Sequence, residues 1–321
     1  MKPGLFGADL EAKPAALEAL ADALAAADPW SGALSAIPEP RRVVFLGMGS
    51  SRYAAGVAAA RLRAAGIDAA AEYASATAGY PAQRDTLVIA ISATGGSRET
   101  LRALDRHAGR ATTVALTNDM NSPLAYRADV VVDLYAGPER SGIACRTFQH
   151  TLGLLLALEA RLTGGEPVTG LLRRAAAATG DLLDRRAEWL PGAASLLDGP
   201  DGVYVLAPAS RLSSAEQSAL MIRECPRRAA GAGETGDWSH VDVYLTKTLD
   251  YRAILYAGSP YEDEAARWLR ERGSTLLAVG PCSPSVERVA SGHLRYVYDD
   301  DFDVALLTET LVAELIADAW A

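Results

Sequence analysis

Cysteine is scarce in this sequence, and its three copies form no recognisable pattern. Cys145, Cys225 and Cys282 are odd in number and lack the C-x-x-C spacing that is typical of a structural zinc site. The small number also argues against a disulfide-stabilised extracellular domain and fits a reducing compartment. We therefore expect a cytoplasmic protein without a bound metal.

The sequence also lacks an excess of positive charge and any long apolar run. Its 31 Lys and Arg residues are outnumbered by 40 Asp and Glu residues, which gives a net charge of −9 and disfavours nucleic acid or an anionic membrane surface as a partner. No apolar run could span a bilayer, and the N-terminus lacks the pattern of a secretory leader. A small anionic substrate is still compatible with this charge, because binding it needs only a local cluster of donors.

Two nucleotide-binding signatures are missing. The sequence has no G-x-x-x-x-G-K-[ST] pattern, and Gly47-x-Gly49 lacks the third glycine of the dinucleotide fingerprint. We therefore predict no cofactor.

What the sequence does contain is an alternation of short apolar runs with helical patterns. Its 321 residues suit two domains of about 150 residues each. Such alternation indicates a parallel sheet that is covered by helices on both faces. In the first half the predicted elements are strands at 43–46, 86–92, 113–117 and 130–134 and a long apolar helix at 147–162.

The same order of strands then occurs a second time. Counterparts of the four strands are predicted at 203–207, 253–257, 275–279 and 294–298, at offsets of 160 to 167 residues. We interpret this as a duplicated α/β domain, with a single long doubly wound sheet as the alternative. The predicted division is an N-terminal helical segment at 1–40, a first domain at 41–165, a helical linker at 166–200 whose helix ends near 190, and a second domain at 201–321.

Two loops of the first copy are rich in glycine and hydroxyl groups. Gly49-Ser50-Ser51 follows the first strand, and Ser92-Ala93-Thr94-Gly95-Gly96-Ser97 follows the next. In parallel α/β sheets ligands bind where strands end and helices begin, and such loops present N–H and O–H donors to a phosphate. The alternative is that these residues only cap helices and form turns. The counterpart in the second copy, Ser259-Pro260-Tyr261-Glu262-Asp263-Glu264, carries three carboxylates and should repel a phosphate.

These loops resemble those of the sugar isomerase (SIS) domain family, and most closely the isomerase half of the glucosamine-6-phosphate synthases. The family pattern Ser-Gln-Ser-Gly-Glu-Thr corresponds to Ser92–Ser97, with the hydroxyls retained and the Gln and Glu lost. Gly-Thr-Ser corresponds to Gly49–Ser51, and Gly-Val-Ala-Ser to Gly142–Cys145. The resemblance implies two tandem, flavodoxin-like three-layer α/β/α domains. It also implies a sugar-phosphate site made of Gly49, Ser50, Ser51, Ser92, Thr94, Ser97, Ile143 and Cys145.

The second copy matches the same family at Glu224 and His240, which are sixteen residues apart as in the synthases. By resemblance, the glutamate moves a proton between C2 and C1 of the sugar, and the histidine, supplied by a neighbouring subunit, opens the ring. Both roles suit the side chains, since imidazole titrates near neutrality and a carboxylate can serve as a base. The alternatives are a helix-end glutamate paired with nearby arginines and a loop histidine that has no role and stacks on Trp238.

The sequence departs from the synthases in two places, which changes the expected reaction. It has no glutaminase domain, and it ends before the tail lysine that forms a Schiff base in the synthases. We therefore expect a homodimeric isomerase or dehydratase (a lyase) that acts on an amino-hexose 6-phosphate of the glucosamine or N-acetylglucosamine type. The alternatives are a deaminase or deglycase of the same substrates, and a non-catalytic sugar-phosphate sensor. The sensor is disfavoured because the N-terminal segment is acidic rather than basic.

Overall fold

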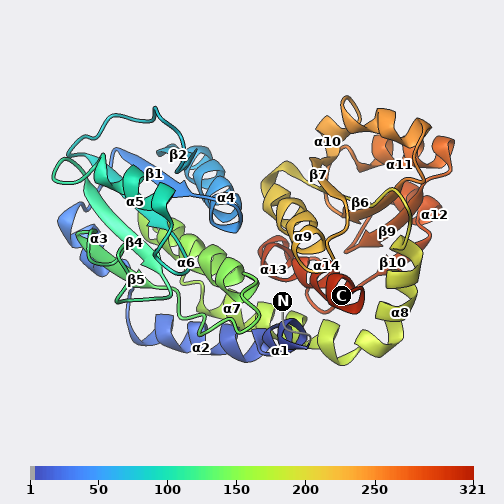
Figure 1. The fold of residues 1–321 in the computed structure, drawn as a ribbon, viewed down its shortest axis with the longest axis horizontal. Coiled ribbons are helices and arrows are strands. Elements are labelled where there is room, and N and C mark those ends of the chain that lie inside the picture. Colours follow the sequence, from blue (N-terminus) through green and yellow to red (C-terminus); the bar gives the residue numbers. More distant parts are fainter. Residues whose placement is uncertain (1–3) are drawn as a thin grey trace. The chain divides into compact units, whose positions relative to one another are not determined.

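A computed structural model describes residues 4–321, which form two compact units (Figure 1). One unit comprises residues 15–139 and 144–173, and the other comprises residues 4–14, 140–143 and 174–321. Residues 1–3 of the predicted N-terminal segment lie outside the described residues. Along residues 4–321, no helix has both the length and the apolar character that crossing a bilayer requires.

The first unit contains a five-stranded sheet in the order β2-β1-β3-β4-β5, with every neighbouring pair parallel. Its three central strands are almost fully buried, because helices and loops exclude water from both faces. The strands are β1 (Arg42–Gly47), β2 (Asp68–Tyr73), β3 (Thr86–Ile91), β4 (Thr112–Thr117) and β5 (Val130–Asp133). The helices in residues 15–173 are most of α2 (Lys13–Ala26), α3 (Ser31–Ala36), α4 (Ser50–Ala64), α5 (Arg98–Asp105), α6 (Arg146–Thr163) and the start of α7 (Thr169–Asp184).

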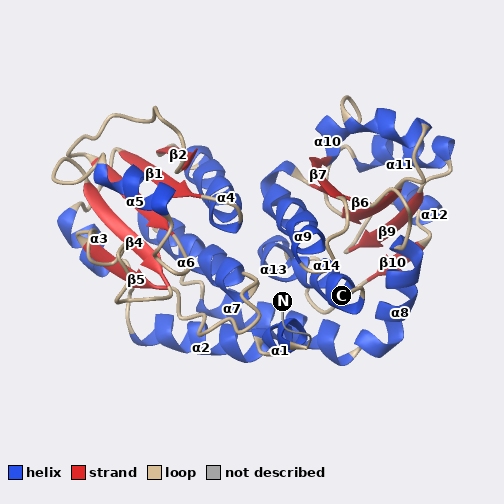
Figure 2. Cartoon of the chain, viewed as in Figure 1, coloured by secondary structure: helices blue, strands red, loops and turns tan. Residues whose placement is uncertain are grey.

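The second unit repeats this topology. Its sheet has the order β10-β9-β8-β6-β7, which read from the other edge is again second, first, third, fourth, fifth in chain order. All of its neighbouring strands are parallel as well. Figure 2 shows helices flanking each sheet. The duplication read from the sequence is therefore present as two sheets of one topology, and the alternative of a single long sheet is excluded.

The strands of the second unit are β6 (Val203–Ala207), β7 (Ala230–Glu234), β8 (Arg252–Tyr256), β9 (Thr275–Val279) and β10 (Gly292–Leu294). Its helices include α1 (Leu5–Glu11), α8 (Arg186–Leu197), α9 (Leu212–Glu224), α10 (Thr235–Trp238), α11 (Glu262–Arg272), α12 (Pro284–Val289), α13 (Phe302–Thr308) and α14 (Thr310–Ala319), with 3₁₀ turns at Ala209–Arg211 and Asp242–Lys247. Its core lies between β6, β8 and β9 and the helices packed on them.

The structure corrects the sequence prediction at several elements. The edge strands β2 and β7 were not predicted. The strand expected at 294–298 is instead β10, at Gly292–Leu294. The chain break expected from residue 191 is also absent: α8 continues through Pro191, which lies inside the helix. Pro191 is the sixth residue of α8 and has no N–H, so the carbonyl four residues before it lacks its helical hydrogen bond. The helix nevertheless continues to Leu197.

A buried ion pair joins the two ends of the second unit. The ammonium group of Lys13, the first residue of α2, donates to a carboxylate oxygen of Glu314 in α14, and both side chains are fully inaccessible to solvent. Nearby, α1 packs against α14. Two charges removed from water are tolerable only as a pair, because an unpaired buried charge has lost its hydration without compensation.

We expect Lys13→Met to lower the free energy of unfolding by about 3–5 kcal/mol, since it leaves the Glu314 carboxylate buried without a cation. Urea denaturation followed by circular dichroism would measure this. The matched control is Arg186→Met, which breaks the exposed Arg186–Glu11 pair and should cost less than about 1 kcal/mol. The double variant Lys13→Met/Glu314→Leu should recover most of the loss; equal losses in Lys13→Met and the control would contradict the assignment.

Candidate functional site

The two glycine-rich loops leave the same edge of the first sheet next to each other. β1 and β3 pair in parallel, with Leu46 opposite Ala90, so both strands end at the same level. The loop after β1 leads into α4 at Ser50, and the loop after β3 leads into α5 at Arg98. The sequence prediction that these loops follow neighbouring strands is thus correct in topology.

The loop after β1 turns tightly into α4. Gly49 has φ +50° and ψ −129° and occupies the N-cap position without a side-chain hydrogen bond. A Cβ on Gly47 would lie 3.0 Å from the backbone nitrogen of Arg52, so the helix returns very close to the strand end. Ser50 and Ser51 therefore form the first turn of a fifteen-residue helix whose cap has no side chain of its own.

The loop after β3 makes a tight turn at the end of the strand and packs against the segment that follows β4. Ser92 is buried, and its carbonyl accepts the N–H of Gly95 at 3.0 Å. Gly95 has φ +62°, and a Cβ there would lie 2.0 Å from the Ser122 hydroxyl oxygen, so only glycine fits. Thr94 stays exposed at the outside of the turn. This packing brings Ser92 and Thr94 together at the end of β3.

Ser97 has a capping role that the sequence left open. Its hydroxyl oxygen accepts the N–H of Thr100 at 3.3 Å and caps α5, and it also contacts the Glu99 carboxylate at 3.1 Å and the Thr100 hydroxyl at 3.1 Å. The capping alternative thus accounts for Ser97, whose proposed ligand contact would have to compete with these bonds.

Ile143 and Cys145 precede and cap α6, and both side chains are buried. The N-terminus of this helix holds a carboxylate of the same chain: Glu139 accepts the N–H groups of Cys145 (2.7 Å), Arg146 (2.6 Å) and Thr147 (3.2 Å) and the Thr147 hydroxyl (2.7 Å). The sequence analysis missed Glu139, because it lies farther from the helix than the three-residue spacing of a capping box.

The corresponding loop in the second unit is closed by a carboxylate as well. Glu262, at the start of α11, accepts the N–H of Gly258 at 2.9 Å and the N–H of Ser283 at 2.6 Å. Asp263 accepts the Ser283 hydroxyl at 2.6 Å. Carboxylates thus occupy the positions where the first unit has glycine and hydroxyl groups. Their negative charge and the donors they occupy oppose phosphate binding there.

Glu224 is the last residue of α9 and is exposed, although the protein atoms around its carboxyl partly exclude water. This burial raises the pKa of Glu224 and outweighs the opposing effect of the Arg223 guanidinium. Arg223 donates to the carbonyl of Ala230, and Arg228 pairs with Asp198. Within residues 4–321 Glu224 forms no ion pair, so the alternative of a glutamate paired with these arginines does not hold.

His240 follows α10 on the same unit. Its backbone N–H donates to the Asp237 carbonyl at 2.9 Å, and its side chain is exposed. Trp238 is buried, and its indole N–H donates to the Tyr251 hydroxyl at 2.7 Å. The residues of the glycine-rich loops and Cys145 therefore lie in the first unit, whereas Ile143, Glu224 and His240 lie in the second.

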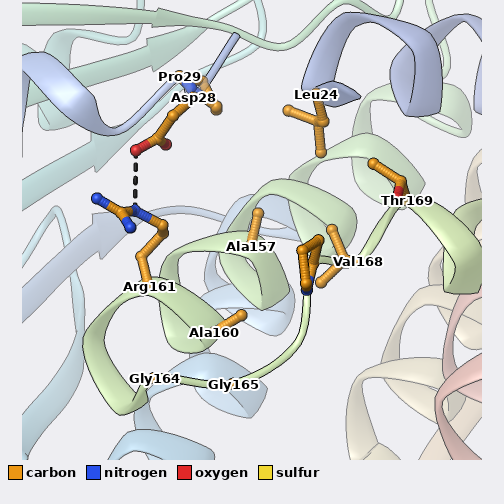
Figure 3. A pocket seen from close by; sticks show the side chains of 11 residues that line it. Leu24, Asp28, Pro29, Ala157, Ala160, Arg161, Gly164, Gly165, Val168 and Thr169 are labelled. Atoms are coloured by element: carbon orange, nitrogen blue, oxygen red, sulfur yellow. Dashed lines mark ion pairs between the residues drawn. The ribbon is translucent and has the colours of Figure 1, made fainter. Parts of the chain in front are cut away.

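A separate pocket of the first unit lies at the C-terminal end of α6 (Figure 3). It adjoins Gly164 at the C-terminal end of that helix, and its wall carries the Arg161–Asp28 ion pair at 2.8 Å. None of the residues predicted from the sequence lines it. Its apolar lining includes Leu24 and Val168, and the charges of Arg161 and Asp28 are already paired with each other.

Comparison with known proteins supports the resemblance seen in the loops. Residues 36–159 match the family model of the SIS domain. The chain is 31% identical over 208 residues to the isomerizing glutamine–fructose-6-phosphate aminotransferase of Aeropyrum pernix, covering 61% of this chain and 34% of the relative. With the same enzyme of Pyrobaculum aerophilum it is 30% identical over 248 residues, covering 73% and 38%. The chain thus spans little more than a third of the length of these two curated relatives.

Solved structures share the fold at low sequence identity. The C-terminal domain of glucosamine-fructose-6-phosphate aminotransferase from Francisella tularensis matches 98% of this chain and 95% of its own, with a TM-score of 0.84 and 18% identity. Tagatose-6-phosphate ketose/aldose isomerase from Escherichia coli matches 99% and 94%, with a TM-score of 0.79 and 15% identity. The resemblance to the SIS domain family is confirmed.

We expect Gly95→Ala to lower the free energy of unfolding by about 2 kcal/mol or more, because the left-handed conformation alone costs an alanine about 1–2 kcal/mol and the new Cβ meets Ser122. Adding Ser122→Gly should remove the clash but not the backbone strain, so the double variant should recover only part of the loss. Thermal and urea unfolding would measure both. A neutral Gly95→Ala variant would contradict the described turn.

The raised pKa of Glu224 predicts a pH-dependent effect of Glu224→Gln. A carboxyl whose pKa is higher in the folded protein favours folding while it is protonated, below its ordinary pKa, and loses that contribution as the pH rises through the folded value. The melting temperature of the wild type relative to Glu224→Gln should therefore fall between pH 4 and pH 7. A difference that stays constant or grows over this range would show that the carboxyl is not desolvated.

Proposed function

We propose that this SIS-domain protein is a sugar-phosphate isomerase or lyase that opens an amino-hexose 6-phosphate and removes its C2 proton. The observation that carries the proposal is the pair of loops at the ends of β1 and β3. β1 and β3 are neighbouring parallel strands; the Gly49-capped start of α4 follows β1, and Ser92 and Thr94 follow β3. A phosphate dianion suits such a place, because it accepts several N–H and O–H bonds and favours a helix N-terminus.

In the proposed mechanism the loops anchor the 6-phosphate through Gly49, Ser50, Ser51, Ser92 and Thr94, with Ser97 holding the second loop in shape. Because this end of the substrate does not react, its binding energy can orient C1 and C2. Ile143 and Cys145, at the start of α6, are proposed to adjoin the sugar as in the resembling family. The contact of the latter two would be through a backbone carbonyl, since their side chains are buried and their N–H groups already donate to Ser141 and Glu139.

Ring opening moves a proton from the C1 hydroxyl and gives one to the ring oxygen, and the exposed imidazole of His240 suits both transfers. Glu224 then takes the C2 proton and returns it to C1. Its raised pKa makes the carboxylate a stronger base than an ordinary glutamate. We propose that the histidine comes from a second copy of the chain, which makes a homodimer part of the working enzyme.

Three outcomes follow C2 proton removal, and the chemistry of the substrate separates them. Return of the proton to C1 gives the ketose. Loss of the C3 hydroxyl as water gives a dehydrated product, which is favoured when C2 carries an N-acetyl group that does not leave as ammonia. Isomerisation of a free amine followed by hydrolysis gives ammonia; one structural neighbour is the glucosamine-6-phosphate deaminase of Thermotoga maritima, at 17% identity and a TM-score of 0.73.

The second candidate function is a sugar-phosphate sensor without catalysis. Sugar-phosphate binding by the loops without proton transfer by Glu224 and His240 would favour the sensor. The position of Glu224 speaks for catalysis instead, because its carboxyl is desolvated and unpaired by arginine. We keep the domain division at 41–165 and 201–321, with a segment at 1–40 and a linker at 166–200, and the cytoplasmic location as parts of the same proposal.

The decisive experiment is incubation of the protein with glucosamine 6-phosphate and with N-acetylglucosamine 6-phosphate in deuterated water. We expect exchange of the C2 hydrogen of one substrate, followed by proton NMR. Glu224→Gln should reduce the exchange about 10²–10⁴-fold, the range of general base catalysis. Absorbance at 240–280 nm would then distinguish a conjugated dehydration product from a ketose.

Two further variants test the assigned roles of His240 and Glu224. His240→Gln should reduce turnover of the cyclic substrate more than that of an open-chain analogue, and Glu216→Gln, on the same helix as Glu224, serves as the control for a general loss of charge. Binding of the sugar phosphate without exchange of C2 hydrogen in any substrate would support the sensor and end the isomerase proposal.

A further inference from the structure

A pocket of about 340 Å³ lies beside the second glycine-rich loop, between α5 and the segment after β2. Three arginines line it, together with Ser75 and Thr77 of the segment that follows β2. Arg98 and Arg102 belong to α5, and Arg106 is the C-cap residue directly after it. The pocket thus begins one residue beyond Ser97, but none of the loop residues assigned to the sugar phosphate lines it.

The three arginines form one row along α5 and its C-cap. They are spaced four residues apart, so their side chains project from the same face of the helix. Like charges at this spacing destabilise a helix. Arg102 and Arg106 lie near the C-terminal end, where the helix dipole favours cations, but Arg98 is the first residue of the helix, where the dipole opposes it. Helix stability therefore does not explain the row.

The positive charges of these arginines are also not balanced by partners within the protein. Within residues 4–321, none of the three guanidinium groups forms a hydrogen bond or an ion pair. Arg127, in the segment between β4 and β5, in contrast pairs with Asp105 at 2.9 Å. Glu99 is the one carboxylate in the lining, and it is held by Ser97; the pKa of Glu99 is lowered by its own backbone and by Ser97 first, and by Arg98 and Arg102 only after these. The lining therefore carries a net charge of about +2.

We propose that this pocket binds a small phosphorylated anion of at least two negative charges, at a second site apart from the glycine-rich loops. Guanidinium groups bind phosphate oxygens through two parallel N–H bonds, and the Ser75 and Thr77 hydroxyls add single donors. All three arginines are exposed, so a ligand can reach them. Binding here requires no reaction at Glu224 and goes beyond the proposed isomerase function.

The test is calorimetric titration of the full chain with inorganic pyrophosphate at constant ionic strength. We expect Arg102→Gln/Arg106→Gln to weaken binding at least tenfold. The matched control Arg84→Gln/Arg110→Gln removes two exposed arginines of the same unit that do not line the pocket, and it should change the dissociation constant less than twofold. Ser92→Ala/Thr94→Val, which impairs the glycine-rich loop, should leave pyrophosphate binding within threefold.

Circular dichroism and thermal unfolding of each variant establish that it is folded, and removing like charges from α5 should not lower its melting temperature. Equal affinity in Arg102→Gln/Arg106→Gln and in the control would overturn the proposal. So would loss of all pyrophosphate binding in Ser92→Ala/Thr94→Val, which would show that the glycine-rich loops are the only anion site. Neither result depends on whether the protein exchanges the C2 hydrogen of a sugar.

Discussion

Parallel pairing of β1 with β3 is the constraint on which the candidate site depends. Because the two strands run side by side in the same direction and in register, their glycine-rich loops must emerge together at one edge of the sheet. Neither loop alone would differ from an ordinary helix cap. The close approaches at Gly47 and Gly95 follow from this arrangement, since each loop has to turn back at once toward the helix or strand next to it.

The carboxylates of the chain show which helix starts are open to a ligand. Glu139 fills the N-terminus of α6, and Glu262 accepts the N–H of Gly258 in the second unit's equivalent loop and that of Ser283 after β9. α4, in contrast, begins at a glycine that has no side chain to offer. An internal carboxylate and an external phosphate satisfy the same N–H groups, so the protein's own anions mark the positions where no ligand is needed. The asymmetry between the two copies has this physical basis.

The buried strands were predictable and the edge strands were not. β1 and β3 are continuous apolar runs, which is what burial on both faces of a parallel sheet requires. β2 and β7 consist largely of alanine and glycine, which have low strand propensity, and they are strands because a neighbour supplies hydrogen bonds on one side. The loops of the site were found because glycine and serine are unusual together at strand ends. Glu139 could not be found, since its partners depend on how residues 139–145 turn in space.

The Lys13–Glu314 pair has a consequence for the order of folding during synthesis. All parts of the first unit have been made once residue 173 has left the ribosome, whereas Lys13 has no partner until Glu314 has been made about 140 residues later. Domains fold as units as soon as their residues are available, so the first unit can fold while the second waits. Until then Lys13 must stay hydrated, and its burial marks the completion of the chain. A nascent chain stalled before α14 would thus expose a charged, incomplete core, which is the kind of surface that chaperones and proteases recognise.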